Sequence, residues 1–126
     1  MSNRLDVIGI GNAMVDALIP STKEEVEKNQ INRNSMNLID EELKNNLHKN
    51  YSVKEMAGGG SVGNSMFGIT SLGGKGSFIG KIKDDNLGKS FSTSLSNAGV
   101  FYKTKPITDG PGTARSFIFV TPDAQR

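Results

Sequence analysis

The sequence predicts an α/β fold, in which strands and helices follow one another along its 126 residues. Two observations carry this prediction. Short apolar runs alternate with longer segments whose apolar residues recur at helical spacing. Glycines and capping residues stand between these segments, where helices and strands would begin and end. A chain of this length is expected to form one domain.

The amino-terminal part of the chain contains three predicted strands and one predicted helix. Residues 5–10 are apolar and predict a buried strand. Residues 14–19 are apolar around Asp16 and predict a second strand, which a polar stretch at 21–30 follows as a short surface helix. Residues 34–39 predict the third strand.

Three further helices are predicted from their N-cap residues. Asp40 would cap the first of them, because acidic residues follow in the first turn, where the helix dipole favours them. Ser61 would cap the second, which we expect to extend to Leu72, just before a pair of glycines. Asp84 or Asp85 would open the third, whose apolar residues recur every four positions.

The remaining strands are predicted at 77–82, 100–103 and 113–121. Three of the predicted strands, at 14–19, 34–39 and 113–121, fall outside the regular alternation of strand and helix. We therefore expect these three to form a small additional sheet.

Composition excludes several kinds of site and partner. The chain has no cysteine, which excludes disulfides and thiolate metal sites and fits a cytoplasmic location. Its single histidine excludes a histidine-based triad or a multi-histidine metal site within the chain. The net charge is +2 and the basic residues are dispersed, so we expect neither nucleic acid nor a membrane as partner. No apolar run approaches the roughly 20 residues that cross a bilayer.

Two glycine motifs that suggest nucleotide binding are incomplete. Gly9-Ile-Gly11 begins like a dinucleotide-binding fingerprint, but Met14 replaces the third glycine. Gly88-Lys89-Ser90 ends like a Walker A loop, but Lys83 stands where the first glycine of that loop is required. We expect neither motif to bind phosphate.

The glycine-rich segment 58–64 is more specific. Its three consecutive glycines, at a predicted strand-to-helix junction, would expose backbone N–H groups beside a helix N-terminus, where a polar ligand can bind. Ser61 and Asn64 add side-chain donors and acceptors. The alternative is that the glycines only permit a tight turn and close packing, and the residues alone do not decide between the two.

Asp16 is a carboxylate in an otherwise apolar segment, so it needs partners. Two neighbouring hydroxyl groups of a ligand would supply them, because an ionised carboxylate accepts through both oxygens. The alternative is a structural aspartate that accepts from backbone amides.

Five segments carry a resemblance to a known family: residues 9–16, 57–65, 78–88, 112–113 and 120–123. In this order and spacing they resemble the PfkB carbohydrate kinase family, and within it the adenosine-kinase-like branch. The resemblance implies a Rossmann-like (ribokinase-like) α/β core with a small β-sheet lid, to which the strands at 14–19, 34–39 and 113–121 would belong. It also implies a sugar or nucleoside bound between core and lid.

The resemblance also implies roles for individual residues. Asp16 would accept hydrogen bonds from two ring hydroxyls, and Arg126 stands near the position of a phosphate-contacting arginine. Carried over residue by residue, the substrate site comprises Asn12, Asp16, Gly59, Gly60, Ser61 and Asn64.

Members of this family are roughly twice as long as this chain or longer, so residues 1–126 correspond to the amino-terminal portion of the kinase domain. The ATP-binding and catalytic portion, with its Gly-Ala-Gly-Asp turn, would be absent. The intact enzyme would use ATP and Mg²⁺ to phosphorylate a primary hydroxyl. We expect the 126 residues to contain no catalytic residue or metal ligand, to bind no cofactor and to be inactive alone.

Two further expectations follow for the chain by itself. A self-contained, non-catalytic domain that binds a sugar or nucleoside is the alternative to an inactive kinase fragment. A sheet cut partway would expose an edge strand and apolar surface, so we expect self-association through that edge or through the lid.

Overall fold

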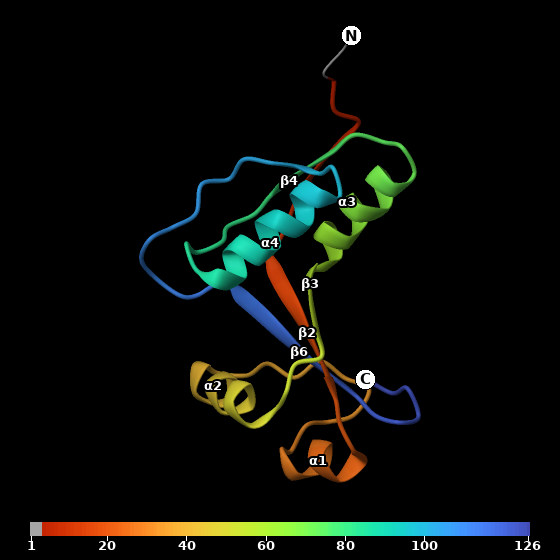
Figure 1. Cartoon of the computed structure of the whole chain (residues 1–126), viewed down its shortest axis with the longest axis vertical. Helices are drawn as coiled ribbons and strands as arrows, with labels where there is room; N and C mark the ends of the chain where they lie inside the picture. Colours follow the sequence, from red (N-terminus) through yellow and green to blue (C-terminus); the bar gives the residue numbers. More distant parts are fainter. Residues whose placement is uncertain (1–3) are drawn as a thin grey trace. The chain divides into compact units, whose positions relative to one another are not determined.

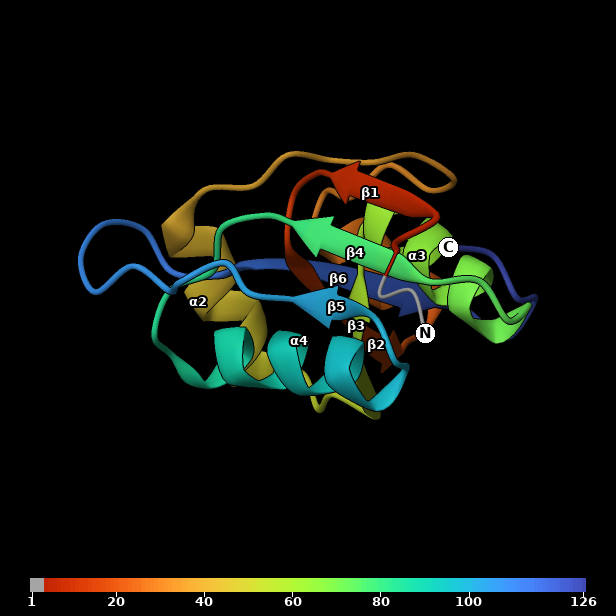
Figure 2. The same cartoon turned by 90° about the horizontal axis from the view of Figure 1, so that it is seen from above.

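The computed structural model describes residues 4–126, and Figures 1 and 2 together label its helices and strands. The chain divides into two compact units. The first unit consists of the residues up to Asp16 together with Ala57–Ser116, and the second consists of Ala17–Met56 together with Phe117–Arg126.

The first unit contains a parallel sheet. Its strands are β1 (Val7–Ile10), β4 (Gly76–Ile79) and β5 (Phe101–Tyr102). They lie side by side in the order β1-β4-β5 (Figure 2). The register places Ile10 opposite Ile79, and Ser77 opposite Phe101. Parallel neighbours need a crossover connection, and a helix supplies it between β4 and β5.

The helices of the first unit are α3 (Ser61–Ser71) and α4 (Asn86–Asn97). Phe91 of α4 packs edge-on against Phe78 of β4, with ring centroids 5.4 Å apart. Met66 of α3 lies beside Gly76 of β4, where an added methyl group would come within 3.2 Å of its Sδ. Gly76 and Phe78 are two positions apart in the strand and share a face. Both helices therefore cover the same face of the sheet.

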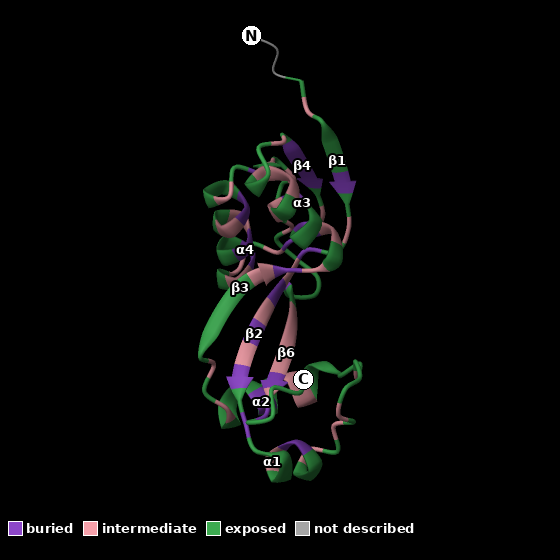
Figure 3. Cartoon of the chain, turned by 90° about the vertical axis from the view of Figure 1, so that its right-hand side faces the viewer, coloured by how far each residue is buried: buried purple, intermediate pink, exposed green. Residues whose placement is uncertain are grey.

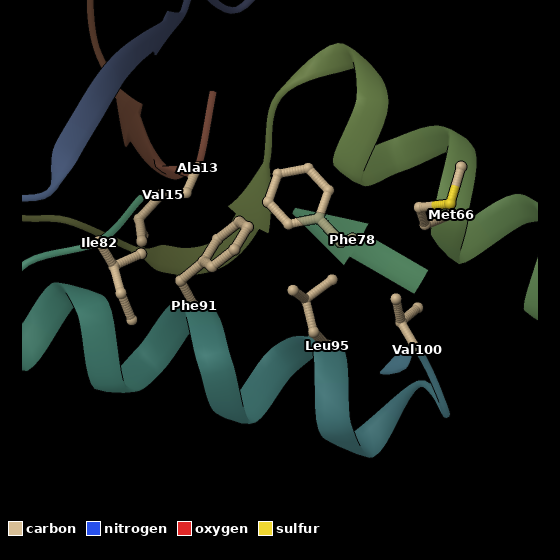
Figure 4. Close-up of a cluster of buried hydrophobic side chains, with 8 residues drawn as sticks. All are labelled: Ala13, Val15, Met66, Phe78, Ile82, Phe91, Leu95 and Val100. Carbon is tan, nitrogen blue, oxygen red and sulfur yellow. The ribbon is translucent and has the colours of Figure 1, made fainter. Parts of the chain in front are cut away.

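The main hydrophobic core lies between these helices and the sheet, and Figure 4 shows its buried side chains in close-up. Phe91 and Leu95 of α4 have no exposed surface, and a fully buried side chain of this size contributes about 1.5–3 kcal/mol. The buried members of the core are Ala13, Val15, Met66, Phe78, Ile82, Phe91, Leu95 and Val100.

Helix α4 begins and ends where its sequence predicts. Asp85 is the N-cap, and its Oδ1 accepts the Gly88 N–H at 2.7 Å. Gly99 follows the helix with a φ of 78°, a left-handed conformation that glycine adopts at low cost.

The second unit has a smaller core of its own. Its helices are α1 (Lys23–Lys28), capped by Thr22, and α2 (Glu41–Asn50), capped by Asp40 as predicted. Tyr51 packs edge-on against Phe119, with ring centroids 5.2 Å apart. The buried members of this core are Ile19, Val26, Leu47 and Phe119.

A second sheet has the strand order β3-β2-β6. Its strands are β2 (Met14–Pro20), β3 (Glu55–Gly59) and β6 (Ala114–Val120), and each runs from one unit into the other. Along β2, Val15, Ala17 and Ile19 are buried, whereas the residues between them are half-buried. This alternation is typical of a strand with one apolar face.

The strand predicted at 34–39 is wrong, because these residues form neither helix nor strand. Asn34 has a φ of 56°, outside the extended region. Ser35 Oγ and Asn37 Nδ2 both donate to the Asn32 carbonyl oxygen, and such local bonds compete with strand pairing. The third strand of this sheet is β3, which ends at the strand-to-helix junction that the sequence predicts at the glycine-rich segment.

Strand β1 forms as predicted, but the expectation that it is buried is wrong. Gly9 faces α3, because an added methyl group there would come within 2.6 Å of Val62 Cγ1. The side chains of Ile8 and Ile10 therefore point to the opposite face, where they are 58% and 74% exposed. In Figure 3 the start of β1 has the colour of exposed residues. Ile79, opposite Ile10 in the register, is 45% exposed.

These exposed side chains, with Phe101 of β5, form the apolar face of the parallel sheet, which comprises Ile8, Ile10, Ile79 and Phe101. Parallel sheets are almost always covered on both faces, so an apolar face of this kind favours association.

We expect the 126-residue chain to self-associate through the apolar face, with a sedimentation coefficient that rises with concentration. Ile8→Lys should weaken this association, because it places a charge on the apolar face, where association would bury it. Leu72→Lys is the matched control, since Leu72 is 90% exposed but lies at the end of α3. A monomer at every concentration would contradict the expectation.

Candidate functional site

The site is built around Asp16, which lies on β2 and is half-buried. A methyl group on Gly59 of β3 would come within 2.2 Å of Asp16 Oδ2 and 2.4 Å of its Cγ. The carboxylate therefore occupies space that only a glycine leaves open. On β6, the Ser116 hydroxyl donates a hydrogen bond to Asp16 Oδ1.

Gly60 turns the chain from β3 into α3 with a φ of 83°, which disfavours any side chain. A methyl group on Gly60 would also come within 2.9 Å of the Asn12 carbonyl oxygen. The turn thus packs directly against the backbone that follows β1. Gly11 reinforces this contact, because its Cα lies against Val62 in the first turn of α3.

The N-terminus of α3 differs from those of the other helices. Ser61 was predicted as its N-cap, but the N-cap is Gly60, and in the described part of the chain no side chain caps this helix. Helices α1, α2 and α4 instead have capping side chains, from Thr22, Asp40 and Asp85. The first-turn N–H groups of α3, with the positive end of its dipole, are therefore available to a polar ligand.

The structure brings most of the predicted site residues together in the first unit. Asp16 contacts Gly59, Asn12 contacts Gly60, and the exposed Ser61 directly follows the turn. Asn64 is exposed one helical turn later, and its N–H donates to the Gly60 carbonyl oxygen at 2.8 Å.

Arg126 belongs to the second unit. There its carbonyl oxygen accepts the Asn34 N–H at 2.9 Å, and its side chain is exposed. Its phosphate contact remains a prediction.

Sequence reasoning missed Ser116. The residue is a hydroxyl in a largely apolar strand, at 100 positions from Asp16, and only strand pairing brings the two together. A polar residue within the apolar strand predicted at 113–121 was the one available signal.

The two incomplete nucleotide motifs have structural roles. Gly9 and Gly11 permit close packing against Val62. The Gly88 N–H is already donated to Asp85, so this glycine offers no phosphate cradle. Within residues 4–126, no group of three or more His, Asp or Glu side chains is placed to hold a metal ion. No helix in the same range has the length and apolarity needed to span a membrane.

Asp85 also joins α4 to the start of β6. Its Oδ2 accepts the Thr113 N–H at 2.9 Å, and its Oδ1 accepts the Thr113 hydroxyl at 2.7 Å. Burial tends to raise the pKa of Asp85, but the hydrogen bonds from Thr113 and Gly88 and the charge of Lys83 outweigh it. The pKa of Asp85 therefore lies below its ordinary value.

Comparison with known proteins assigns this arrangement to a family. The family model described as pfkB family carbohydrate kinase matches residues 10–126. The chain belongs to the pfkB family. The family and the ribokinase-like α/β fold that the sequence resemblance implies are thus confirmed.

Individual relatives of this pfkB chain include solved structures. A probable sugar kinase protein from Rhizobium etli CFN 42 is 41% identical, with a TM-score of 0.90 over 98% of this chain and 37% of that one. The adenosine kinase from Sinorhizobium meliloti is 40% identical, with a TM-score of 0.88 over 96% and 37%. Fructokinase-2 of Solanum lycopersicum is 34% identical over 70 residues, which are 56% of this chain and 21% of that protein. The chain thus spans well under half the length of these relatives.

Gly60→Ala should destabilise the chain by about 1–3 kcal/mol, because it combines a strained positive φ with a clash against Asn12. Gly68→Ala is the matched control: Gly68 lies within α3 and has open space around it. That change should stabilise the chain by about 0.5–1 kcal/mol. Urea denaturation measures the free energy of unfolding of both variants. Equal changes in Gly60→Ala and Gly68→Ala would show that the turn does not require glycine.

Asp85→Asn should lower stability near neutral pH by about 1–2 kcal/mol, through weaker hydrogen bonds to Thr113 and Gly88. The native pKa of Asp85 is lowered, so its contribution is complete above the unfolded value of about 4 and is lost as pH falls through the native value. The difference between the two proteins in urea denaturation should therefore shrink as the pH falls below the unfolded value. A difference that stays constant with pH would contradict this role.

Proposed function

We propose that this chain is the substrate-recognition part of an ATP-dependent kinase for a small sugar or nucleoside. The observation that carries the proposal is the position of the Asp16 carboxylate on the Gly59 backbone, next to the uncapped N-terminus of α3. Acceptors and donors of hydrogen bonds thus lie together on adjacent segments of one unit. A polyhydroxylated ring needs both.

Each group has a chemical role in this proposal. Asp16 accepts hydrogen bonds from two neighbouring ring hydroxyls, because an ionised carboxylate has about four acceptor positions. The first-turn N–H groups of α3 donate to ring oxygens. The side chains of Asn12, Ser61 and Asn64, all exposed, complete the set with groups that both donate and accept.

A ligand with a vicinal diol on a ribose ring is the substrate class that we favour. The match to an adenosine kinase and a probable sugar kinase, at 40% and 41% identity, extends over nearly all of this chain. The match to a fructokinase is restricted to 70 residues at 34% identity. We also propose that the second unit corresponds to the lid of such kinases.

Phosphoryl transfer by the whole protein would move the ATP γ-phosphoryl group to a primary hydroxyl of the substrate, with Mg²⁺ neutralising the phosphate charges. The Gly88-Lys89-Ser90 motif does not fit a phosphate-binding loop, since the Gly88 N–H donates to Asp85 at the start of α4. We therefore propose that these 126 residues bind substrate without phosphorylating it.

A second candidate function is a self-contained binding domain that takes part in no phosphoryl transfer. The observation in its favour is that all the proposed sugar-site residues lie in the first unit, which has its own core. The two candidates differ in one outcome: only the first requires that a longer form of the protein turn over ATP with the same ligand.

Asp16→Asn should weaken the binding of adenosine and ribose at least tenfold, about 1.4 kcal/mol, because it replaces one of the two acceptor oxygens by an NH₂ donor and removes the negative charge. Titration calorimetry or ligand-detected NMR on the 126-residue chain measures the affinity. Asp109→Asn is the matched control, since Asp109 is an exposed carboxylate in a turn outside the proposed site. Wild-type affinity in Asp16→Asn, or no binding of adenosine, ribose or fructose, would contradict the proposal.

A further inference from the structure

Ser116 is a hydroxyl residue that lies against the proposed diol-binding carboxylate. It is on β6, which neighbours β2 in the second sheet, and its Oγ–H donates to Asp16 Oδ1. Both residues are half-buried. A hydrogen bond to an ionised carboxylate is roughly twice as strong as one between neutral groups, so this contact can select one orientation of Asp16.

The opposite flank of the carboxylate is bounded by backbone. A methyl group on Gly59 would lie 2.2 Å from Asp16 Oδ2 and 2.7 Å from Oδ1, so the carboxylate rests directly on the glycine of β3. Asp16 is therefore held between a bare backbone on one neighbouring strand and a hydroxyl donor on the other. The glycine provides space and no donor side chain, which leaves Ser116 to set the rotation of the carboxylate.

We infer that Ser116 is a positioning residue for diol recognition by Asp16. Its hydroxyl occupies one acceptor position on Oδ1 and thereby directs the remaining acceptors toward the ring hydroxyls of the ligand. The inference rests on the proposed function of the Asp16 site. Ser116 acts through Asp16 and does not itself need to touch the ligand.

The physical effect is preorganisation. A carboxylate that is already fixed in the binding orientation loses little side-chain entropy when the ligand arrives, whereas a rotating carboxylate loses more. Removal of the Ser116 hydroxyl should therefore weaken diol binding by about three- to tenfold while the fold is retained.

The matched pair Ser116→Thr and Ser116→Val isolates the hydroxyl. The two side chains have nearly the same shape, both suit a strand, and only threonine donates a hydrogen bond. Three-bond NMR couplings then report the χ1 distribution of Asp16 without any ligand. We expect one dominant rotamer in the wild type and in Ser116→Thr, and averaged couplings in Ser116→Val.

Ligand binding supplies the second readout. The probes are adenosine and 2′-deoxyadenosine, because the deoxy form lacks one hydroxyl of the diol. The preference for adenosine should fall about three- to tenfold in Ser116→Val and be retained in Ser116→Thr. In an Asp16→Asn background, Ser116→Val should cause no further loss, since a positioning residue has nothing left to position.

Failure of the inference differs from failure of the proposed function. If the wild type prefers adenosine but Ser116→Val keeps that preference and a single Asp16 rotamer, Ser116 does not position Asp16 and only the inference is overturned. If Ser116→Val weakens both nucleosides equally, or additively with Asp16→Asn, Ser116 contacts ligand or supports the fold instead. If the wild type binds neither nucleoside, the proposed function and the inference fall together.

Discussion

Asp16 lies so close to the backbone of Gly59 that no side chain fits at position 59. The Asn12 carbonyl oxygen lies against Gly60 and leaves no room for a side chain at position 60 either. These two contacts join two segments that are distant in sequence: residues 12–16, which lead from β1 into β2, and the passage from β3 into α3. Because Gly60 adopts a positive φ, the chain can turn sharply and start α3 directly beside the carboxylate. The proposed chemistry of the site depends on this packing.

A consequence is that α3 begins without a capping side chain. The other helices satisfy their first-turn N–H groups internally, through residues such as Asp40 and Asp85. At α3 the N-cap residue is a glycine, so the helix lacks the stabilisation that a capping side chain would give. A ligand could supply the missing hydrogen-bond acceptor. This pattern favours the binding turn that we propose over a turn that serves packing alone, the two alternatives that the residues leave open.

Several features that depend on local sequence could be predicted, whereas a contact that depends on long-range strand pairing could not. The caps at Asp40 and Asp85 follow from residue type and position, because capping involves only the next few residues. The contact of Ser116 with Asp16 depends on the pairing of β6 with β2, which no local pattern encodes. The segment 34–39 misled the prediction because its apolar residues suggested a strand, whereas its asparagine and serine side chains bond to nearby backbone.

The exposure of β1 has a similar cause. An apolar run indicates that both faces of a strand are suited to burial. It does not indicate whether the residues that cover each face belong to these 126 residues. The chain spans 37% of the structures it matches, and its parallel sheet exposes Ile8 and Ile10 on the face away from α3. The proposed recognition residues and the main core are thus both in the first unit, together with an apolar face suited to further packing.

The central claim is that the turn at Gly59–Asn64 and the adjacent Asp16 bind a polyhydroxylated ligand. Backbone amide NMR of the 126-residue chain, titrated with adenosine, tests it most directly. The account predicts that the largest shift changes occur at residues 59–64, Asn12 and Asp16. Saturable changes confined to other regions, such as the exposed strand at Val7–Ile10, would contradict it.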